Sequence, residues 1–294
     1  MSFISYLING ISLGSVYAII ALGYTMVYGI AKMLNFAHGD VIMIGAYVVM
    51  ASVTGAGLPP AAAILVAIIF CTVLGVLIET VAYGPLLNAA SSLAVLITAI
   101  GVSYLLQNIA LLIFGANTIS FPAVLSIPAL VLAGGSLTIT GEAIVTIISC
   151  IVIMIALTLF IKKSKAGQAM LAVSEDKGAA QLMGINVNGT IALTFAIGSA
   201  LAAVAGVLLC SAYPTLTPYT GSMPGIKAFV AAVFGGIGSI PGALIGGILL
   251  GVIEIFGKAY ISSQMADAIV FAVLIVVLIV KPTGILGKNI QEKV

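Results

Sequence analysis

The chain has 294 residues, of which 62% are hydrophobic and only 6% are charged. A water-soluble domain carries about a quarter charged residues because its surface needs them, so this composition excludes a soluble globular protein. The net charge is +2 and the sequence contains no arginine, which removes the guanidinium-rich surface that nucleic-acid binding usually needs. The composition indicates a membrane protein that crosses the bilayer several times.

Charged residues are separated by long apolar stretches, each longer than the roughly 20 residues that a helix needs to cross a bilayer. Because these runs are continuous and do not alternate with polar residues, an all-α bundle is favoured over a barrel. Glycines, prolines and charges mark the ends of the spans. The sequence predicts helices near 3–31, 40–54, 60–83, 91–114, 142–161, 189–211, 226–257 and 266–281.

Two connections define the orientation of these spans. The connection 115–141 contains Phe121-Pro122, Ile127-Pro128 and Gly134-Gly135, which interrupt a helix, so we expect a surface loop or a short re-entrant element there. The connection 162–188 holds the strongest lysine cluster, and lysines in short loops mark the cytoplasmic side. Counting spans from that cluster places 115–141 and the N-terminus outside.

The stretch 226–257 is long enough to be read in two ways. If it crosses once, the tail that begins at Lys281 emerges outside, against the positive-inside rule. A break at the glycine- and proline-rich segment 235–241 would give two half-length pieces, about eight or nine crossings in total and a cytoplasmic tail. We therefore expect a broken or re-entrant helix in 226–257.

The cytoplasmic connection 162–188 is predicted to contain a short helix from Glu175 to Met183. Its signals are a serine that can cap the N-terminus, acids that complement the dipole in the first turn, an apolar face, and a glycine that can end it. The residues of this set are Ser174, Glu175, Asp176, Ala179, Leu182, Met183 and Gly184. The apolar face either packs on the chain's own bundle or fits a groove in a soluble cytoplasmic partner.

Glycines recur at four-residue spacing after the expected break, a pattern that lets two membrane helices approach closely. The pattern consists of Gly238, Gly242 and Gly246, and of Gly247 and Gly251. Such a face could serve packing within the chain or an interface between subunits.

The hexapeptide from Asn35 to Asp40 holds the only histidine of the chain. It is expected near the membrane edge, where Asp40 can cap the span that begins at Val41 and His38 can bond to a neighbouring backbone group. The alternative interpretation is a proton relay. Because no second histidine accompanies His38, a metal site is not expected.

The other ionisable residues are predicted to lie near span ends or in pairs. Glu79 should reach the inner interface, Glu254 and Lys258 are spaced i, i+4 and can neutralise each other, and Glu142 and Asp267 fall in first turns. Almost no ionisable residue is then expected at the bilayer centre, which argues against an ion-coupled pump. No nucleophile with its base, P-loop or haem-ligand pair is present in the sequence, so we expect neither an enzyme nor a cofactor.

Seven segments spread along the chain carry a resemblance to a known family. They are Leu7–Gly10, Leu13–Ala18, Leu22–Gly29, Asn35–Asp40, Ala172–Asn186, Phe229–Gly251 and Lys281–Gly287. Together they resemble the H-type permease of bacterial branched-chain amino acid ABC importers over nearly the whole chain. The resemblance implies one permease domain over 1–294, in the bacterial inner membrane.

That resemblance implies a subunit that passes leucine, isoleucine and valine inward, driven by ATP hydrolysis on partner subunits. The implied partners are a second permease subunit, two cytoplasmic ATPase subunits, an extracytoplasmic substrate-binding protein and the lipid bilayer. The segment 167–184 would couple to the ATPases, although Gln168 and Ala172 stand where the family commonly has arginine. The alternatives are a permease for another small solute, such as urea or an amide, and an ion-driven secondary transporter.

Candidates for the translocation path or gate come from the hexapeptide and from the region 221–241, where half-helix ends are expected. They are Asn35, His38, Asp40, Gly221, Gly225, Gly235 and Gly236.

Overall fold

The computed structural model describes residues 2–86, 92–132 and 137–287, and these residues form an all-α bundle with four short strands. Of the helices described, six are long and apolar enough to cross a membrane. The helices are α1 (Ser2–Ala31), α2 (His38–Thr54), α3 (Pro60–Ile78, continued by the turns Glu79–Tyr83 and Gly84–Leu86), α4 (Ser92–Phe114), α5 (Gly141–Lys163), α6 (Lys165–Glu175), α7 (Lys177–Leu182), α8 (Val187–Ala212), α9 (Ser222–Gly235), α10 (Ile240–Tyr260) and α11 (Ala266–Val280).

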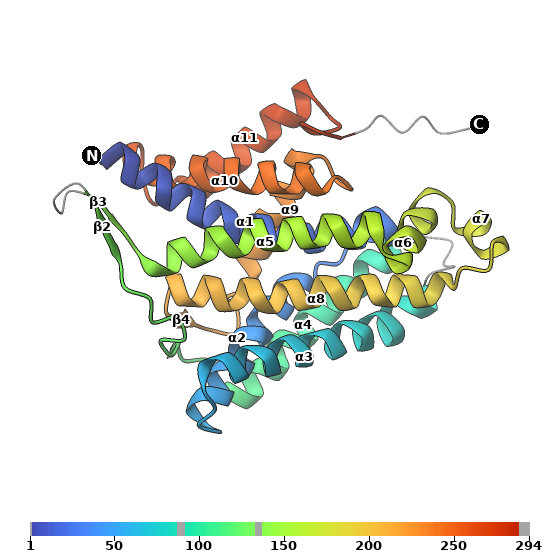
Figure 1. Cartoon of the computed structure of the whole chain (residues 1–294), viewed down its shortest axis with the longest axis horizontal. Coiled ribbons are helices and arrows are strands. Elements are labelled where there is room, and N and C mark those ends of the chain that lie inside the picture. Colours follow the sequence, from blue (N-terminus) through green and yellow to red (C-terminus); the bar gives the residue numbers. More distant parts are fainter. Residues whose placement is uncertain (1, 87–91, 133–136, 288–294) are drawn as a thin grey trace.

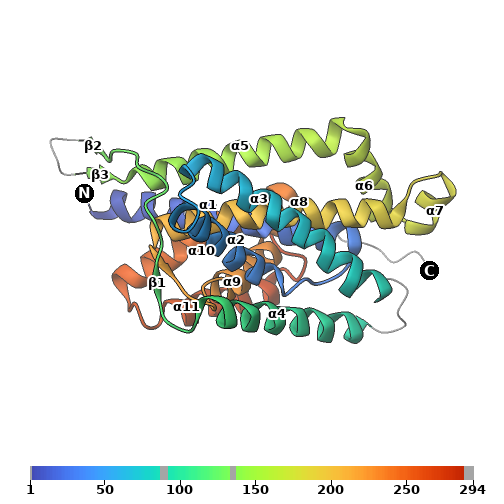
Figure 2. The same cartoon turned by 90° about the horizontal axis from the view of Figure 1, so that it is seen from below.

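The long helices run lengthwise through the molecule, and the connecting segments gather at its two ends (Figures 1 and 2). The helices α6 and α7 lie at one end, and the N-terminus lies at the other beside the hairpin of β2 (Leu130–Leu132) and β3 (Leu137–Ile139). The lysine-rich end with α6 and α7 is the one predicted to be cytoplasmic, and it is called the inner end below.

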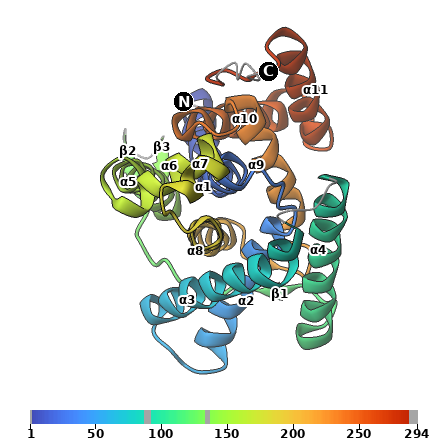
Figure 3. The same ribbon diagram turned by 90° about the vertical axis from the view of Figure 1, so that its right-hand side faces the viewer.

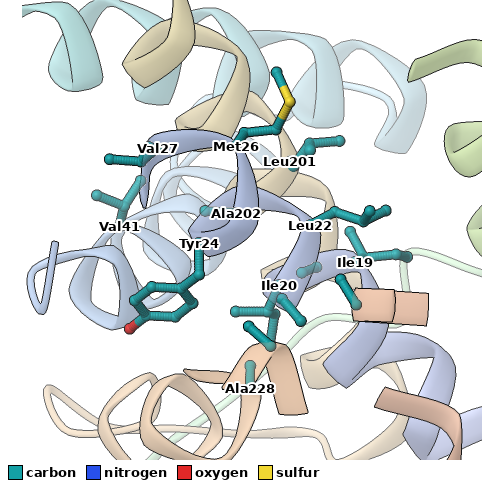
Figure 4. Close-up of a cluster of buried hydrophobic side chains, with 14 of the residues drawn as sticks. Ile19, Ile20, Leu22, Tyr24, Met26, Val27, Val41, Leu201, Ala202 and Ala228 are labelled. Carbon is teal, nitrogen blue, oxygen red and sulfur yellow. The ribbon is translucent and has the colours of Figure 1, made fainter. Parts of the chain in front are cut away.

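Helix α1 forms the centre of the bundle, with α5, α8, α9 and α10 around it (Figure 3). Its residues from Val16 to Leu22 are at most 3% exposed, as expected for a helix that is apolar on all sides. Figure 4 shows side chains of α1 packed with Val41 of α2, Leu201 and Ala202 of α8, and Ala228 of α9. The core therefore depends on contacts of α1 with the next helix, α2, and with α8 and α9, which are distant in sequence.

The break expected in 226–257 is confirmed, but the expectation of two half-length pieces is wrong, because α10 has 21 residues and is long enough to cross a membrane. Helix α9 ends at Gly235, Gly236 and Gly238 follow with φ angles of +103° and +92°, and α10 begins at Ile240. Left-handed angles of this kind favour glycine, which has no Cβ to clash. The break lies against the inner end of α1, since a Cβ on Gly29 would come 3.3 Å from the Cα of Gly238.

After α11, the chain returns to this inner end. The backbone N–H groups of Ile285 and Leu286 donate to the carbonyls of Phe234 and Gly235, each at 2.9 Å. These bonds satisfy carbonyl groups at the C-terminal end of α9 that its own helix leaves free. The chain thus reaches Gly287 at the end with the lysine-rich segment, as predicted.

The connection 115–141 lies at the end of the bundle opposite α6 and α7, called the outer end below, and it contributes strands. Besides the β2–β3 hairpin, β1 (Ile119–Ser120) pairs antiparallel with β4 (Thr215–Leu216) from the connection between α8 and α9. The Gly134-Gly135 pair falls outside the described residues.

Candidate translocation path and coupling segment

The cytoplasmic connection folds as two short helices, α6 and α7. The predicted helix 175–183 capped by Ser174 is wrong, because the backbone is extended at Asp176, with φ −155° and ψ 114°. The Asp176 carboxylate caps α7 by accepting a hydrogen bond from the backbone N–H three residues later, at 2.9 Å. Ser174 lies in the last turn of α6 and donates to a carbonyl of its own helix. Gly184 ends the segment at φ +82°, as expected for a glycine after a helix.

Helix α7 is attached to the inner end of α1 and carries an exposed apolar tip. Lys177 Nζ donates to the carbonyl of Ala31, the last residue of α1, at 3.0 Å. Burial, followed by the charge of Lys32, lowers the pKa of the Lys177 ammonium. Leu182 and Met183 are 90% and 82% exposed, and a pocket of about 320 Å³ separates α7 from the start of α8. The remaining residues of the predicted set, Glu175 and Ala179, are also exposed.

Two helices begin beside each other inside the bundle. Helix α2 starts at His38 and α9 at Ser222, and the first residues of α2 are buried. A Cβ on Gly39 would lie 2.7 Å from the carbonyl oxygen of Gly221, and one on Gly225 would lie 2.9 Å from the Cα of Gly39. Because these glycines lack side chains, the two N-termini, which carry the positive ends of the helix dipoles, meet in the interior.

Asp40 lies in the first turn of α2 and is 2% exposed. Its predicted role as the cap of a span that begins at Val41 is wrong, because α2 begins at His38, earlier than the sequence suggested. The Asp40 carboxylate instead accepts a hydrogen bond from Gln107 Nε2 of α4 at 2.8 Å. The same nitrogen lies 3.3 Å from Ser222 Oγ, so one amide joins α2, α4 and α9.

His38 lies deeper in the bundle than the sequence predicted. A Cβ on Gly23 would overlap the His38 ring, and Gly23 precedes the end of α1 by more than two turns. The predicted hydrogen bond to a backbone group stays a prediction, and His38 Nε2 is buried without a hydrogen-bond partner among the described residues. The predicted position near the membrane edge is wrong, because the chain after α1 folds back into the bundle. Asn35 in this segment is also buried, and its Oδ1 accepts from the Tyr83 hydroxyl at 3.0 Å.

The predicted pair of Glu254 and Lys258 is confirmed at 2.6 Å, and it belongs to a larger ion cluster. Lys227 Nζ lies 2.9 Å from Glu254 Oε1 and 2.6 Å from Asp267 Oδ1. The Tyr17 hydroxyl donates to Glu254 Oε2 at 2.8 Å. The ion cluster joins α1, α9, α10 and α11, and its two lysines neutralise its two acids.

The expectation of almost no ionisable residue in the membrane core is wrong. Lys227 and Glu254 are 6% and 1% exposed, and Asp40 is equally buried. Glu79, expected to reach the interface, is 4% exposed and accepts a hydrogen bond from its neighbouring threonine at 3.3 Å. Sequence reasoning also missed Gln107 as a partner of Asp40. Gln107 and Lys227 both stand alone in apolar surroundings, which could have marked them as functional or paired. Gln107 interrupts an uncharged apolar stretch, and Lys227 is the single charged residue between 178 and 253.

The glycine pattern of α10 produces close backbone contacts within the chain. Gly242 and Gly246 face the C-terminal end of α9, whereas Gly247 and Gly251 face α1. A Cβ on Gly247 would lie 2.5 Å from the Cα of Ala18, so only small residues permit this approach. Gly238, the first member of the pattern, lies in the break before α10.

Comparison with known proteins gives a consistent set of relatives. The family model described as "Branched-chain amino acid transport system / permease component" matches residues 6–278. The high-affinity branched-chain amino acid transport system permease protein LivH of Salmonella typhimurium is 48% identical over 99% of this chain and 98% of the relative. LivH of Escherichia coli and the corresponding permease protein BraD of Pseudomonas aeruginosa are 47% and 45% identical with the same coverage.

A solved structure supports the fold independently. PsaBC from Streptococcus pneumoniae in complex with Fab matches with a TM-score of 0.52 over 95% of this chain and 92% of that chain, at 17% identity. At this identity, the similarity concerns the arrangement of helices alone.

Proposed function

Because the chain belongs to the family of permease components of branched-chain amino acid transport systems, we propose that it forms the membrane path for leucine, isoleucine and valine in an ABC importer. It is a multi-pass membrane protein, consistent with its six candidate spans and its shorter apolar helices. The whole chain acts as one permease domain, since a single apolar core includes residues from α1 through α11.

The proposed partners are a second permease subunit, two cytoplasmic ATPase subunits and an extracytoplasmic binding protein. The observation that supports ATPase docking is the exposed tip of α7 at the inner end. Leu182 and Met183 present apolar side chains where a solvent-exposed helix would ordinarily carry polar ones. An apolar helix tip of this kind fits a groove on a soluble partner.

The contacts of α7 provide a route by which ATPase movement could reach the path. Lys177 connects α7 to the last carbonyl of α1, and α1 packs along α8, α9 and α10. Because packed helices shift as rigid elements, displacement of α7 would move the centre of the bundle and the junction of α2 and α9. The candidate gate residues Gly221, Gly225, Gly235 and Gly236 lie at the two ends of α9.

The test is uptake by the complete transporter reconstituted in vesicles. The double variant Leu182→Ser/Met183→Ser should lose ATP-dependent leucine uptake and binding of the ATPase subunits, while remaining in the membrane. The matched control is Ile261→Ser, which replaces an apolar side chain that is 67% exposed after the outer end of α10. Unchanged uptake by the double variant would refute the docking role. Uptake by the permease alone, driven by an ion gradient, would instead support a secondary transporter.

A further inference from the structure

Three carboxylates are buried in the bundle, and they differ in how their charge is compensated. Glu254 lies between two lysines, at 2.9 Å and 2.6 Å. Asp40 and Glu79 are nearly as buried, at 2% and 4% exposure, yet within the described part of the chain neither forms an ion pair with a lysine or histidine. An ionisable group inside a membrane protein without a counter-ion is a candidate functional site.

Asp40 is distinguished from Glu79 by the helix ends beside it, because Gln107 links its carboxylate to Ser222, the first residue of α9. Its partner Gln107 is followed on α4 by Asn108, which is exposed, and Ser222 is followed on α9 by Met223, which is 42% exposed. Figure 3 shows α4 standing at the edge of the bundle. The Asn108 amide donates to a carbonyl of its own helix at 2.7 Å, and the neighbouring Gln107 lies where α2, α4 and α9 meet.

The groups that hold Asp40 are neutral and have alternative partners. Gln107 Nε2 lies 2.8 Å from Asp40 Oδ1, and the hydroxyl oxygens of Ser222 and Ser103 lie 3.3 and 3.4 Å from the same nitrogen. If Gln107 turned toward these hydroxyls, its amide would stay hydrogen-bonded while the carboxylate became free. Gln107 can therefore cover and uncover Asp40 without leaving a buried donor unpaired.

We propose that Asp40 pairs transiently with the α-ammonium group of the amino acid as it crosses the bundle, and that Gln107 covers the carboxylate between passages. The inference rests on the proposed function, because it requires a substrate that carries an ammonium group. A carboxylate forms strong charge-assisted hydrogen bonds with ammonium groups in a low-dielectric interior. No lysine of the described segments pairs with Asp40, which leaves that position open to the substrate, whereas Glu254 is already neutralised.

The experiment uses the complete transporter in lipid vesicles, with leucine-loaded binding protein outside and ATP inside. Asp40→Asn keeps the size of the side chain and removes the charge, Asp40→Glu keeps the charge, and Glu79→Gln is the control for loss of a buried acid elsewhere. Two rates are measured for each variant, namely leucine uptake and the ATP hydrolysis that loaded binding protein stimulates. The thermal unfolding of each variant is monitored through the exposure of its thiols, and it shows whether the variant is folded.

We expect Asp40→Asn to lower the kcat of uptake by about 10- to 100-fold, the range for loss of a hydrogen bond to a charged group. Stimulated ATP hydrolysis should persist, Asp40→Glu should recover most of the uptake, and Glu79→Gln should behave as wild type. The inference is overturned if Asp40→Asn transports leucine normally, or if its uptake and ATP hydrolysis fall in parallel. It is also overturned if a protonophore abolishes wild-type uptake, since loss of uptake with the proton gradient would indicate a proton relay. If Asp40→Asn does not fold, failure of folded Asp40→Glu to transport would also overturn it. A wild-type assembly that hydrolyses ATP but imports no leucine would refute the proposed function itself.

Discussion

Replacing Lys227 with methionine should measurably destabilise the bundle. Lys227 is 6% exposed and donates to Glu254, which is buried, and to Asp267, whose side chain is 47% exposed. Loss of the hydrogen bond to buried Glu254 should cost about 1.5–3 kcal/mol, and loss of the solvent-exposed pair with Asp267 at most about 1 kcal/mol. Methionine retains the apolar stem, and Glu254 keeps Lys258, so the free energy of unfolding should fall by about 2–4 kcal/mol.

The assay can use the chain's own cysteines. Cys71, Cys150 and Cys210 are 0–1% exposed, so a maleimide dye that fluoresces on reaction reports their exposure as the protein unfolds on heating. For a chain of this length, the expected loss corresponds to a fall in Tm of about 5–15 °C. The control is Lys163→Met, at an exposed lysine at the end of α5, which should leave Tm unchanged.

A double-mutant cycle separates the ion pair from general effects of the substitutions. Glu254→Gln alone leaves Lys227 with Asp267 as its remaining acidic partner. The free energy of unfolding that the double variant Lys227→Met/Glu254→Gln loses should therefore be smaller, by at least about 1.5 kcal/mol, than the sum of the losses of the two single variants. Strict additivity, or a Lys227→Met variant whose Tm lies within about 1 °C of wild type, would refute the reasoning that the cluster contributes to stability.

Three further predictions concern other parts of the chain. Asp176→Ala should destabilise α7 by about 1 kcal/mol through loss of its N-cap, with Asp176→Asn nearly neutral, as checked by hydrogen exchange of the α7 amides. Gly247→Leu should prevent α10 from packing on α1, and the absence of a monodisperse peak in size-exclusion chromatography would show it. The control is Gly101→Leu, at an exposed glycine of α4 with open space around its Cβ position. Lys32→Asn removes a neighbouring positive charge and fits the left-handed backbone at φ +60°. This substitution should raise the pKa of Lys177, because the charge of Lys32 lowers that pKa. NMR of 13C-methylated lysines would measure the shift, and an unchanged or lower pKa of Lys177 would contradict the influence of Lys32.

Several features followed from the sequence because their physical causes are local. Apolar runs of sufficient length gave the spans, and Gly236, Gly238 and the following proline gave the break, since these residues interrupt a helix wherever it lies. The spacing of Glu254 and Lys258 predicted their pairing, because residues four apart share one face of a helix.

The errors occurred where a local signal competed with a distant partner. Both Ser174 and Asp176 can cap a helix, and the extended backbone at Asp176 decided between them. Asp40 suited a cap in sequence, but its carboxylate is held by Gln107, sixty-seven positions away. No spacing rule connects residues so far apart.

Length and hydropathy by themselves determined the class of this protein, because a bilayer restricts how a chain can satisfy its backbone. The glycines and the proline of 235–241 determined the broken helix, and the lysine distribution predicts its sidedness. The tertiary structure alone decided that α1 is central and that α2 and α9 begin together in the interior. It also decided that Lys227 neutralises Glu254, while among the described residues Asp40 has no such partner. The physical reason is that an isolated charged residue in an apolar run looks the same in the sequence whether or not an opposite charge lies beside it in the folded chain. Only the packing of helices distant in sequence places its partner beside it.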